Sequence, residues 1–140
     1  MAKCTVVKAG ALFISKQGLS SAPAISADSV GSAAIHMQLL TIPPGVRAKA
    51  HKHAAHETAI YVISGEAHMD YGERLEQHLV VRAGDFLYIP ADVPHRPYNA
   101  SLSVPCLTII ARTDPNEQES VVLLPELEGS VKRRRRLKAA

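Results

Sequence analysis

The sequence predicts an all-β fold, either a sandwich or a barrel, and three observations support this prediction. Seven or eight short apolar segments follow one another at intervals of roughly 8 to 12 residues. Glycine or proline stands at nearly every boundary between them, as in the turn signal PPG of residues 43–45. No segment shows helical periodicity over three turns, so we expect short strands joined by turns.

The first strand candidate is TVVKAGALFI, residues 5–14, and we expect a loop from there to residue 33. From residue 34 onwards the segments are more apolar and their boundaries are clearer. We expect strands within seven segments, of which the third and fourth form a hairpin: residues 34–42, 57–65, 66–72, 77–85, 85–95, 103–112 and 119–127.

A chain of 140 residues, 46% of them hydrophobic, suits one domain with one core. We divide it into an N-terminal extension with a possible short strand (1–33), a barrel (34–125) and a basic tail that we expect to be disordered (126–140).

The net charge of +3 conceals an uneven distribution of charge. Six basic residues lie in the sequence VKRRRRLKAA, residues 131–140, which leaves 10 basic against 13 acidic residues in the rest of the chain. A mildly acidic body argues against nucleic-acid binding, except weakly through the tail. The tail has no aromatic residue, so it is not suited to stacking on bases.

The sequence has neither a membrane span nor a signal peptide that we can identify. No run of about 18 apolar residues occurs, and the N-terminus lacks a long apolar core and a clear cleavage site. Two cysteines, Cys4 and Cys106, do not make a disulfide scaffold. We therefore expect a cytoplasmic protein.

The segment GVRAKAHKHAAHET, residues 45–58, concentrates metal-ligating side chains. In a strand, His51 and His53 would project from the same face, about 6 to 7 Å apart, and could converge on one ion. Glu57 shares their parity, so we expect Glu57 to point inward and His56 to lie on the surface. The alternative is a solvated loop of histidines and lysines. His95, in a later segment, is a fourth candidate ligand.

Two motifs in this part of the chain resemble those of the cupin family. The first family motif is Gly, five residues, His-x-His, three or four residues, Glu, about six residues, Gly. It corresponds here to Gly45, His51, His53, Glu57 and Gly65, with Gly65 one residue later than the commonest spacing.

The second family motif is matched by Gly84, Pro90, His95 and Asn99 at the family's spacing. Asp92 stands where the family usually has glycine, and Asp tolerates turn geometry well.

The resemblance implies a double-stranded β-helix, a jelly-roll barrel, with four ligands pointing into it: His51, His53, Glu57 and His95. It also implies one divalent transition metal ion (Mn, Fe, Ni, Zn, Co or Cu), since such a donor set disfavours Ca and Mg.

Three further residues are candidates for the site. Tyr61 shares strand parity with Glu57 and could be a hydrogen-bond donor or acid near the metal, or a packed core tyrosine. Arg47 and Lys49 share parity with the ligand histidines and could bind an anionic substrate, or be solvated charges at the rim.

The leading functional hypothesis is a metal-dependent enzyme that acts on a small organic molecule by oxygenation, decarboxylation or isomerisation. The alternatives are a non-catalytic, metal-loaded protein that binds or senses a small molecule, and a scaffold with a structural metal. We also expect a homodimer, with residues 119–127 or the N-terminal strand at or near the interface.

Overall fold

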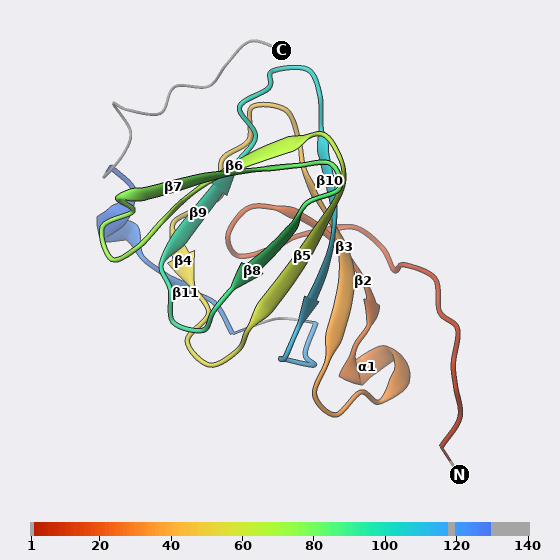
Figure 1. Ribbon diagram of the computed structural model, residues 1–140. Coiled ribbons are helices and arrows are strands. Elements are labelled where there is room, and N and C mark those ends of the chain that lie inside the picture. The colour runs from red at the N-terminus through yellow and green to blue at the C-terminus, as the bar shows by residue number, and fades with distance from the viewer. Residues whose placement is uncertain (1, 118–119, 130–140) are drawn as a thin grey trace.

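The computed structural model describes residues 2–117 and 120–129, and it contains two antiparallel sheets (Figure 1). The six-stranded sheet has the order β1 (Phe13–Ile14), β2 (Ser20–Ile25), β3 (His36–Ile42), β10 (Cys106–Arg112), β5 (Thr58–Ser64) and β8 (Phe86–Ile89). The five-stranded sheet has the order β11 (Val122–Leu123), β4 (His51–Lys52), β9 (His95–Tyr98), β6 (Glu66–Tyr71) and β7 (Gln77–Arg82).

The all-β prediction is confirmed, and the two sheets form the barrel-like sandwich of a double-stranded β-helix. The expected hairpin is β6–β7, with Glu66 opposite Arg82. Helical structure in the described residues is limited to α1 (Ala27–Val30) and a 3-10 turn, η1 (Pro125–Leu127). Neither is long and apolar enough to cross a membrane.

The expectation of a loop after residue 14 was wrong, because residues 20–25 form β2 and pair with β3. The pairing register shifts between Pro23 and Ile25, which accommodates a proline that cannot donate to the ladder. Most of the expected first strand is not a strand, and only Phe13–Ile14 pair, with β2.

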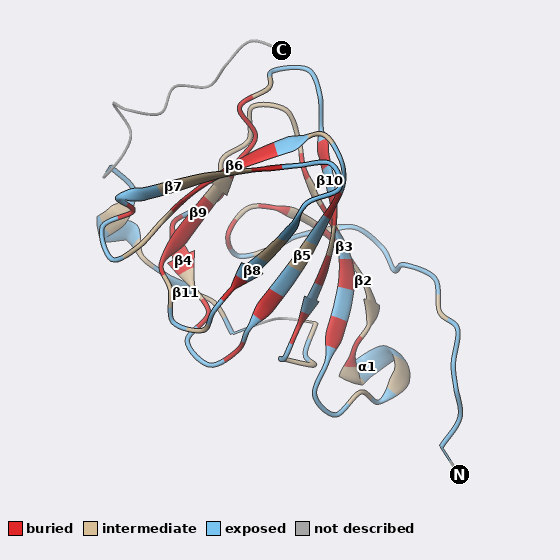
Figure 2. Cartoon of the chain, in the orientation of Figure 1, coloured by how far each residue is buried: buried red, intermediate tan, exposed pale blue. Residues whose placement is uncertain are grey.

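Alternation along the strands decides which side chains enter the barrel, as the red and blue bands of β3 and β5 show (Figure 2). The inward residues of β3 and β10 alternate with exposed or half-exposed ones. Residues from both sheets form the main core: Leu19, Leu40, Ile42, Ala48, Val62, Ala67, Val81, Cys106 and Ile110. Packing of these side chains between the sheets is the principal source of stability.

A second, smaller cluster joins the C-terminal segment to the body. Ala50 and Leu75 are fully buried, and Leu124 and Leu127 pack against them. The apolar segment 119–127 is therefore partly covered within the chain itself. The basic residues of the predicted tail lie in residues 130–140, outside the described residues.

We predict that only Cys4 reacts with iodoacetamide at pH 8 in the native protein, and that Cys106 reacts as well after unfolding. Cys4 is exposed, whereas Cys106 is 0% exposed and burial raises the pKa of its thiol to about 11. The thiolate is the reactive form of cysteine, so Cys106 is protected from alkylation both by its burial and by its raised pKa. Mass spectrometry of the alkylated protein measures this. Rapid native alkylation of the Cys4→Ser variant would contradict the prediction.

Candidate metal centre

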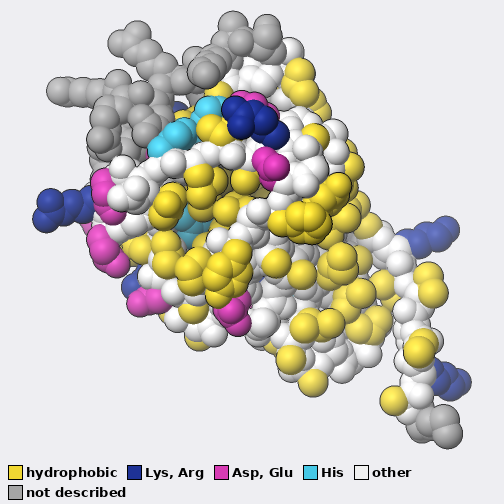
Figure 3. All heavy atoms as spheres, viewed as in Figure 1, with side chains coloured by type: hydrophobic (Ala, Val, Ile, Leu, Met, Phe, Trp, Pro, Cys, Tyr) yellow, Lys and Arg dark blue, Asp and Glu magenta, His cyan; other side chains and the backbone are white. Residues whose placement is uncertain are grey.

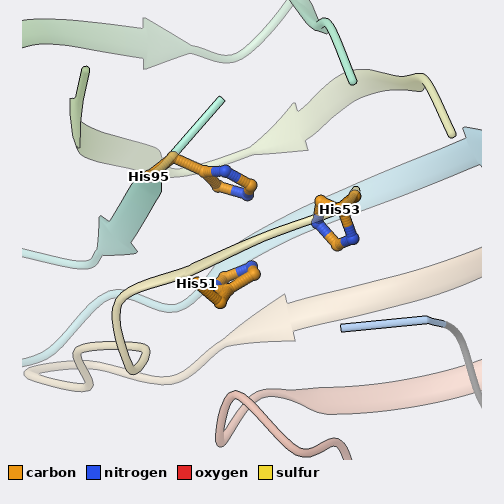
Figure 4. A group of neighbouring side chains, drawn as sticks. All are labelled: His51, His53 and His95. Carbon is orange, nitrogen blue, oxygen red and sulfur yellow. The ribbon is translucent and has the colours of Figure 1, made fainter. Parts of the chain in front are cut away.

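Pairing between β4 and β9 brings together the histidines of the two sequence motifs. His51 lies directly opposite His95 in the ladder, and His53 follows β4 on the same face. One ligand nitrogen from each ring lies within 4.8 Å of the others. The three rings come from two separate stretches of chain and gather at one point (Figure 4).

All three histidines are buried, at 2%, 5% and 2% exposure for His51, His53 and His95. The Nδ1 atom of His51 lies 2.6 Å from the carbonyl oxygen of Lys49, and that of His95 lies 2.9 Å from the carbonyl oxygen of Val93. A carbonyl oxygen can only accept a hydrogen bond, so we assign the ring proton of His51 and of His95 to Nδ1. The Nε2 atom of each of these two rings then carries a free lone pair that can coordinate a metal ion. Such outer contacts hold a ring in the orientation that metal binding needs.

The histidines line a cavity of about 60 Å³ between the two sheets. By the same measure one water molecule needs roughly 10–15 Å³, so the cavity can hold several waters or a small molecule. Most of the wall is aliphatic, with residues such as Leu40, Val62 and Ile110. Five of the other polar lining residues come from the N-terminal segment and the six-stranded sheet, and His68 comes from the five-stranded sheet. The five are Gln17, Gln38, Thr58, Thr108 and Arg112.

The parity argument for Glu57 and His56 was wrong. Glu57 is exposed, and its Oε1 accepts a 2.6 Å hydrogen bond from the Tyr88 hydroxyl, which raises the pKa of Tyr88. His56 is 3% exposed and its ring centroid lies 4.6 Å from that of His53. Residues 54 and 55 form a bend, so strand alternation does not continue from His53 to Glu57.

The spacing of the first motif carried a signal for this outcome. Counting back six intervening residues from Gly65 gives Thr58. Thr58 is the first residue of β5, is 5% exposed and lines the cavity. The position of Gly65, one residue later than usual, therefore indicated that Thr58 and not Glu57 takes the inward position of the motif. No larger residue fits at position 65 without a shift of the backbone, because a Cβ at Gly65 would lie 2.3 Å from the Pro105 carbonyl oxygen.

Tyr61 does not face the cavity, contrary to its tentative assignment. It is 36% exposed, and its ring packs against Phe86, with centroids 4.7 Å apart, on the outer face of the six-stranded sheet. The inward residues of β5 are Thr58, Ile60 and Val62, which all line the cavity. Alternation along β5 starts with Thr58 facing inward, so Tyr61, three residues later, faces outward.

Arg47 and Lys49 also lie outside the cavity. The Arg47 guanidinium sits 4.3 Å above the Tyr98 ring, where burial and the charge of Arg96 lower its pKa. Lys49 is exposed and contributes through its backbone: its carbonyl contacts His51 and its N–H donates to Gln17. Ala50 and His51 are both buried, so alternation is interrupted between them.

Near the Tyr98 ring lie two further histidines, His68 and His78, of which only His68 is buried. His68 is 8% exposed and stacks on Tyr98, and its Nδ1 lies 3.1 Å from His78 Nε2. His78 Nδ1 lies 2.8 Å from Asp70 Oδ1, and Asp70 forms a 3.7 Å ion pair with Arg96. This polar network joins residues of β6, β7 and β9, and one of its members, His68, also lines the cavity.

The second motif positions the metal centre through its turn. Asp92 has φ 66°, so it adopts the left-handed conformation expected from its place in the motif. Its N–H donates to the His53 carbonyl at 2.7 Å, and its carboxylate pairs with Lys52 Nζ at 2.9 Å, which raises the pKa of Lys52. Asn99 Nδ2 donates to the carbonyls of Ile42 and Val104 and fixes the end of β9.

Comparisons with known proteins agree with this geometry. The structure of oxalate decarboxylase from Bacillus subtilis at pH 4.6 matches with a TM-score of 0.66 and 26% identity, over 79% of this chain and 29% of that chain. An uncharacterized conserved protein with a double-stranded β-helix domain from Klebsiella pneumoniae matches with a TM-score of 0.62 and 18% identity, over 78% and 86% of the two chains. The chain thus spans less than a third of the decarboxylase.

No curated protein matches the sequence significantly. The family model of the cupin domain matches residues 38–111, which include both motifs and all three clustered histidines. Because that match covers more than half of the chain, the protein belongs to the cupin family.

Proposed function

We propose that this cupin binds one divalent transition metal ion through His51, His53 and His95, and uses it on a small organic molecule. Oxygenation, decarboxylation and isomerisation are the reaction classes that suit such a centre. The observation that carries the proposal is the cluster of three buried imidazoles on the wall of a mainly aliphatic cavity between the two sheets.

The donor set fits a transition metal better than Mg or Ca. Imidazole nitrogen suits Zn, Cu, Fe and Ni, whereas Mg and Ca prefer oxygen ligands. Manganese is a further candidate, because a solved structure of the Bacillus subtilis oxalate decarboxylase is described in terms of its Mn(II) centers. Mn, Fe, Ni, Zn, Co and Cu all stay within the proposal. Glu57 stays outside the proposed ligand set.

A bound ion would supply Lewis acidity or a place for oxygen to bind. The residues of the chain supply the rest. The carbonyls of Lys49 and Val93 hold two imidazoles in position, so little reorganisation is needed when a ligand arrives. The aliphatic part of the wall lowers the local polarity of the cavity, which strengthens the polar contacts inside it.

Decarboxylation gains support from the similarity to oxalate decarboxylase. This similarity concerns only part of the decarboxylase, since this chain spans 29% of its length.

A non-catalytic role in binding or sensing a small molecule is the second candidate. The observation that favours it is the composition of the cavity wall, in which the described lining residues include no Asp, Glu, Lys or Tyr. Acid–base chemistry would then depend on histidine or on bound water.

We place the protein in the cytoplasm, because both cysteines are free and a reducing compartment keeps them so. Weak contact of the basic tail with nucleic acid stays a prediction, since its basic residues lie outside the described residues.

The first test is metal content. We expect close to one transition metal ion per chain after purification without added metal, and a loss of at least tenfold in affinity for Co(II) in His51→Ala and His95→Ala, since each variant removes one of three donors. Mass spectrometry of the metal and the visible spectrum of the Co(II) protein measure these quantities. The control is His78→Gln, a histidine outside the cavity, which should bind normally.

The metal-loaded protein should then be assayed for oxygen uptake and carbon dioxide release on diketones, phenols and 2-oxo acids. Turnover that is lost in His51→Ala supports an enzyme. Ligand binding without turnover supports the second candidate. A wild-type protein that binds no transition metal, even when metal is added, would overturn the proposal.

A second prediction separates Glu57 from the metal centre. Glu57→Gln should leave the affinity for Co(II) unchanged, because the carboxylate lies on the exposed surface against Tyr88. The same substitution should lower the pKa of Tyr88 towards its ordinary value, because the hydrogen bond to the carboxylate raises it. Ultraviolet titration against Tyr88→Phe measures this shift. A loss of Co(II) from Glu57→Gln would return Glu57 to the ligand set.

We also propose a homodimer, whose interface is the outer face of the six-stranded sheet and not residues 119–127. Apolar side chains gather over β5 and β8 in Figure 3. One cross-strand row on this face runs Leu39, Ile109, Tyr61 and Phe86. Phe86 is 82% exposed, and monomers rarely leave large contiguous apolar patches in water.

Light scattering at micromolar concentration should therefore give a dimer for the wild type and a monomer for Phe86→Glu. The substitution places a charge on an apolar interface but changes no buried contact, so the fold should persist. Val6→Glu is the control, because Val6 is 97% exposed in the N-terminal segment. A wild-type monomer, or a dimer that survives Phe86→Glu, would rule out this interface.

A further inference from the structure

We propose that Thr58 is a specificity-determining residue, whose hydroxyl group hydrogen-bonds the oxygen atom of a small aliphatic ligand in the cavity. Ketones and alcohols are the simplest molecules of that class. This inference rests on the proposed function, since it concerns the ligand of the same cavity. A buried hydroxyl group that the described residues leave without a hydrogen bond is the observation behind it.

The position of Thr58 in the six-stranded sheet directs its side chain into the barrel. Thr58 is the first residue of β5 and begins the inward row of that strand, which continues with Ile60 and Val62. It is 5% exposed and lines the same cavity as the three clustered histidines. A molecule in the cavity therefore lies against the row that Thr58 begins.

Thr58 also lies beside the two segments that carry the histidines. It follows His53 by five residues, and its cross-strand partner in β8 is Ile89. The turn after Ile89 leads to His95, and within this turn the N–H of Asp92 donates to the His53 carbonyl oxygen. Thr58 is therefore at the same end of the barrel as the candidate metal centre.

The hydroxyl group of Thr58 is the unusual feature of this wall. Its Oγ1 atom is buried, and no residue within 2–117 or 120–129 forms a hydrogen bond with it. A buried hydroxyl without a hydrogen bond lowers stability, and native proteins leave few polar groups in that state. Valine has nearly the same shape, favours strands and would avoid this loss. A polar group kept at such a position is expected where a ligand uses it.

Thr108 provides a comparison on the same wall. It belongs to the inward row of β10, is 4% exposed and lines the cavity, as Thr58 does. Its Oγ1 donates to the Leu40 carbonyl oxygen at 2.9 Å, which is a contact within the sheet. The hydroxyl of Thr108 therefore has a structural use, whereas the described part of the chain supplies none for that of Thr58.

Thr58 can turn its hydroxyl group towards a ligand without any change in the backbone. Rotation about the Cα–Cβ bond moves the side chain between staggered rotamers and can exchange the positions of the hydroxyl and the methyl group. A hydroxyl group both donates and accepts, so it can bond a carbonyl oxygen or an O–H group. The oxygen of a ketone or an alcohol therefore matches it.

The neighbours of Thr58 along the barrel specify the rest of the ligand. The next inward pair of β5 and β10 is Ile60 with Ile110, and the pair after that is Val62 with Thr108. Inward positions recur about every 6–7 Å along a strand, so a ligand with its oxygen at Thr58 places its next atoms against aliphatic side chains. A cavity of about 60 Å³ limits this ligand to a short chain.

A hydrogen bond to water inside the cavity is the competing explanation. A cavity of this size can hold several waters, and one of them would satisfy the hydroxyl without any part in the choice of ligand. That explanation predicts that the preference for an oxygen-bearing ligand does not depend on Thr58. The two explanations therefore differ in the effect of a substitution at Thr58 on this preference.

The test uses butan-2-one and 2-methylbut-1-ene, in which a methylene group replaces the oxygen, as probes of the full-length Zn(II)-loaded protein. NMR titration measures the two dissociation constants, and their ratio gives the preference for the ketone. Thr58→Val should lower this preference by about fivefold, because one hydrogen bond is lost. Thr58→Ser keeps the hydroxyl and should keep the preference. Thr108→Val is the matched control and should leave it unchanged, because the Thr108 hydroxyl is bound to Leu40.

Thermal unfolding of the metal-free protein tests the state of the hydroxyl separately. Thr58→Val should unfold at the wild-type Tm or above it, whereas Thr108→Val should lose about 3 °C, because only Thr108 gives up a hydrogen bond within the chain. A loss in Thr58→Val as large as that in Thr108→Val would mean that the Thr58 hydroxyl has a partner in the chain, and would overturn the proposal. Thr58→Ala, which also lacks the hydroxyl, replaces Thr58→Val in the titration if the valine variant does not fold.

The proposal is also overturned if the wild type binds neither probe, or if the variant without the hydroxyl keeps the full preference for the ketone. Failure of the metal proposal would be visible separately, as absence of Zn(II) from the wild type. The titrations are then repeated on the metal-free protein. A preference that falls by about fivefold in Thr58→Val would support Thr58 without a metal, and an unchanged preference would overturn its role.

Discussion

Strict alternation of side chains across two facing sheets is the constraint on which the interior depends. Along β10 the inward residues change from Cys106 to Arg112, and along β3 they change from Ile42 to His36, in register. The end of the sheet that holds Cys106 is therefore apolar, and the end that holds Arg112 is polar. A cavity with one polar end can orient a small molecule without any loop that closes over it.

The cluster of three histidines depends on a very short strand that is supported from both sides. β4 has two residues, and His51 pairs with His95 on one side and with Leu123 of β11 on the other. The N–H of Ala50 donates to Glu128 Oε1 at 2.7 Å, and its carbonyl accepts from Leu124. Residues 120–129 thus hold β4 and its histidine in place, because a strand of two residues paired on one side alone would be weakly supported.

Where the strands are regular, the sequence was sufficient. The segments that became β3, β5, β6, β7, β8 and β10 show apolar residues bounded by turns, and the structure has strands within all of them. The two motifs also identified His51, His53 and His95, because pairing of His51 with His95 follows from the family arrangement that the motifs indicate.

Where alternation is interrupted, the sequence was misleading. Parity counted from His53 passes through the bend at residues 54 and 55, so it failed for Glu57, His56 and Tyr61 together. The assignment of Arg47 and Lys49 failed for a similar reason, the break between Ala50 and His51. β2 was missed because its small residues and Pro23 lack a strand pattern, and its pairing with β3 is a tertiary effect.

Thr58 connects the first motif with the composition of the cavity wall. It occupies the inward position that the commonest motif spacing gives to glutamate, and it lies directly opposite Arg112. A glutamate there would add a carboxylate to the three imidazoles and would lower the net charge of a bound ion. With threonine in its place, no Asp or Glu is among the described residues that line the cavity, so the charged ligand of the family motif is lacking from that wall.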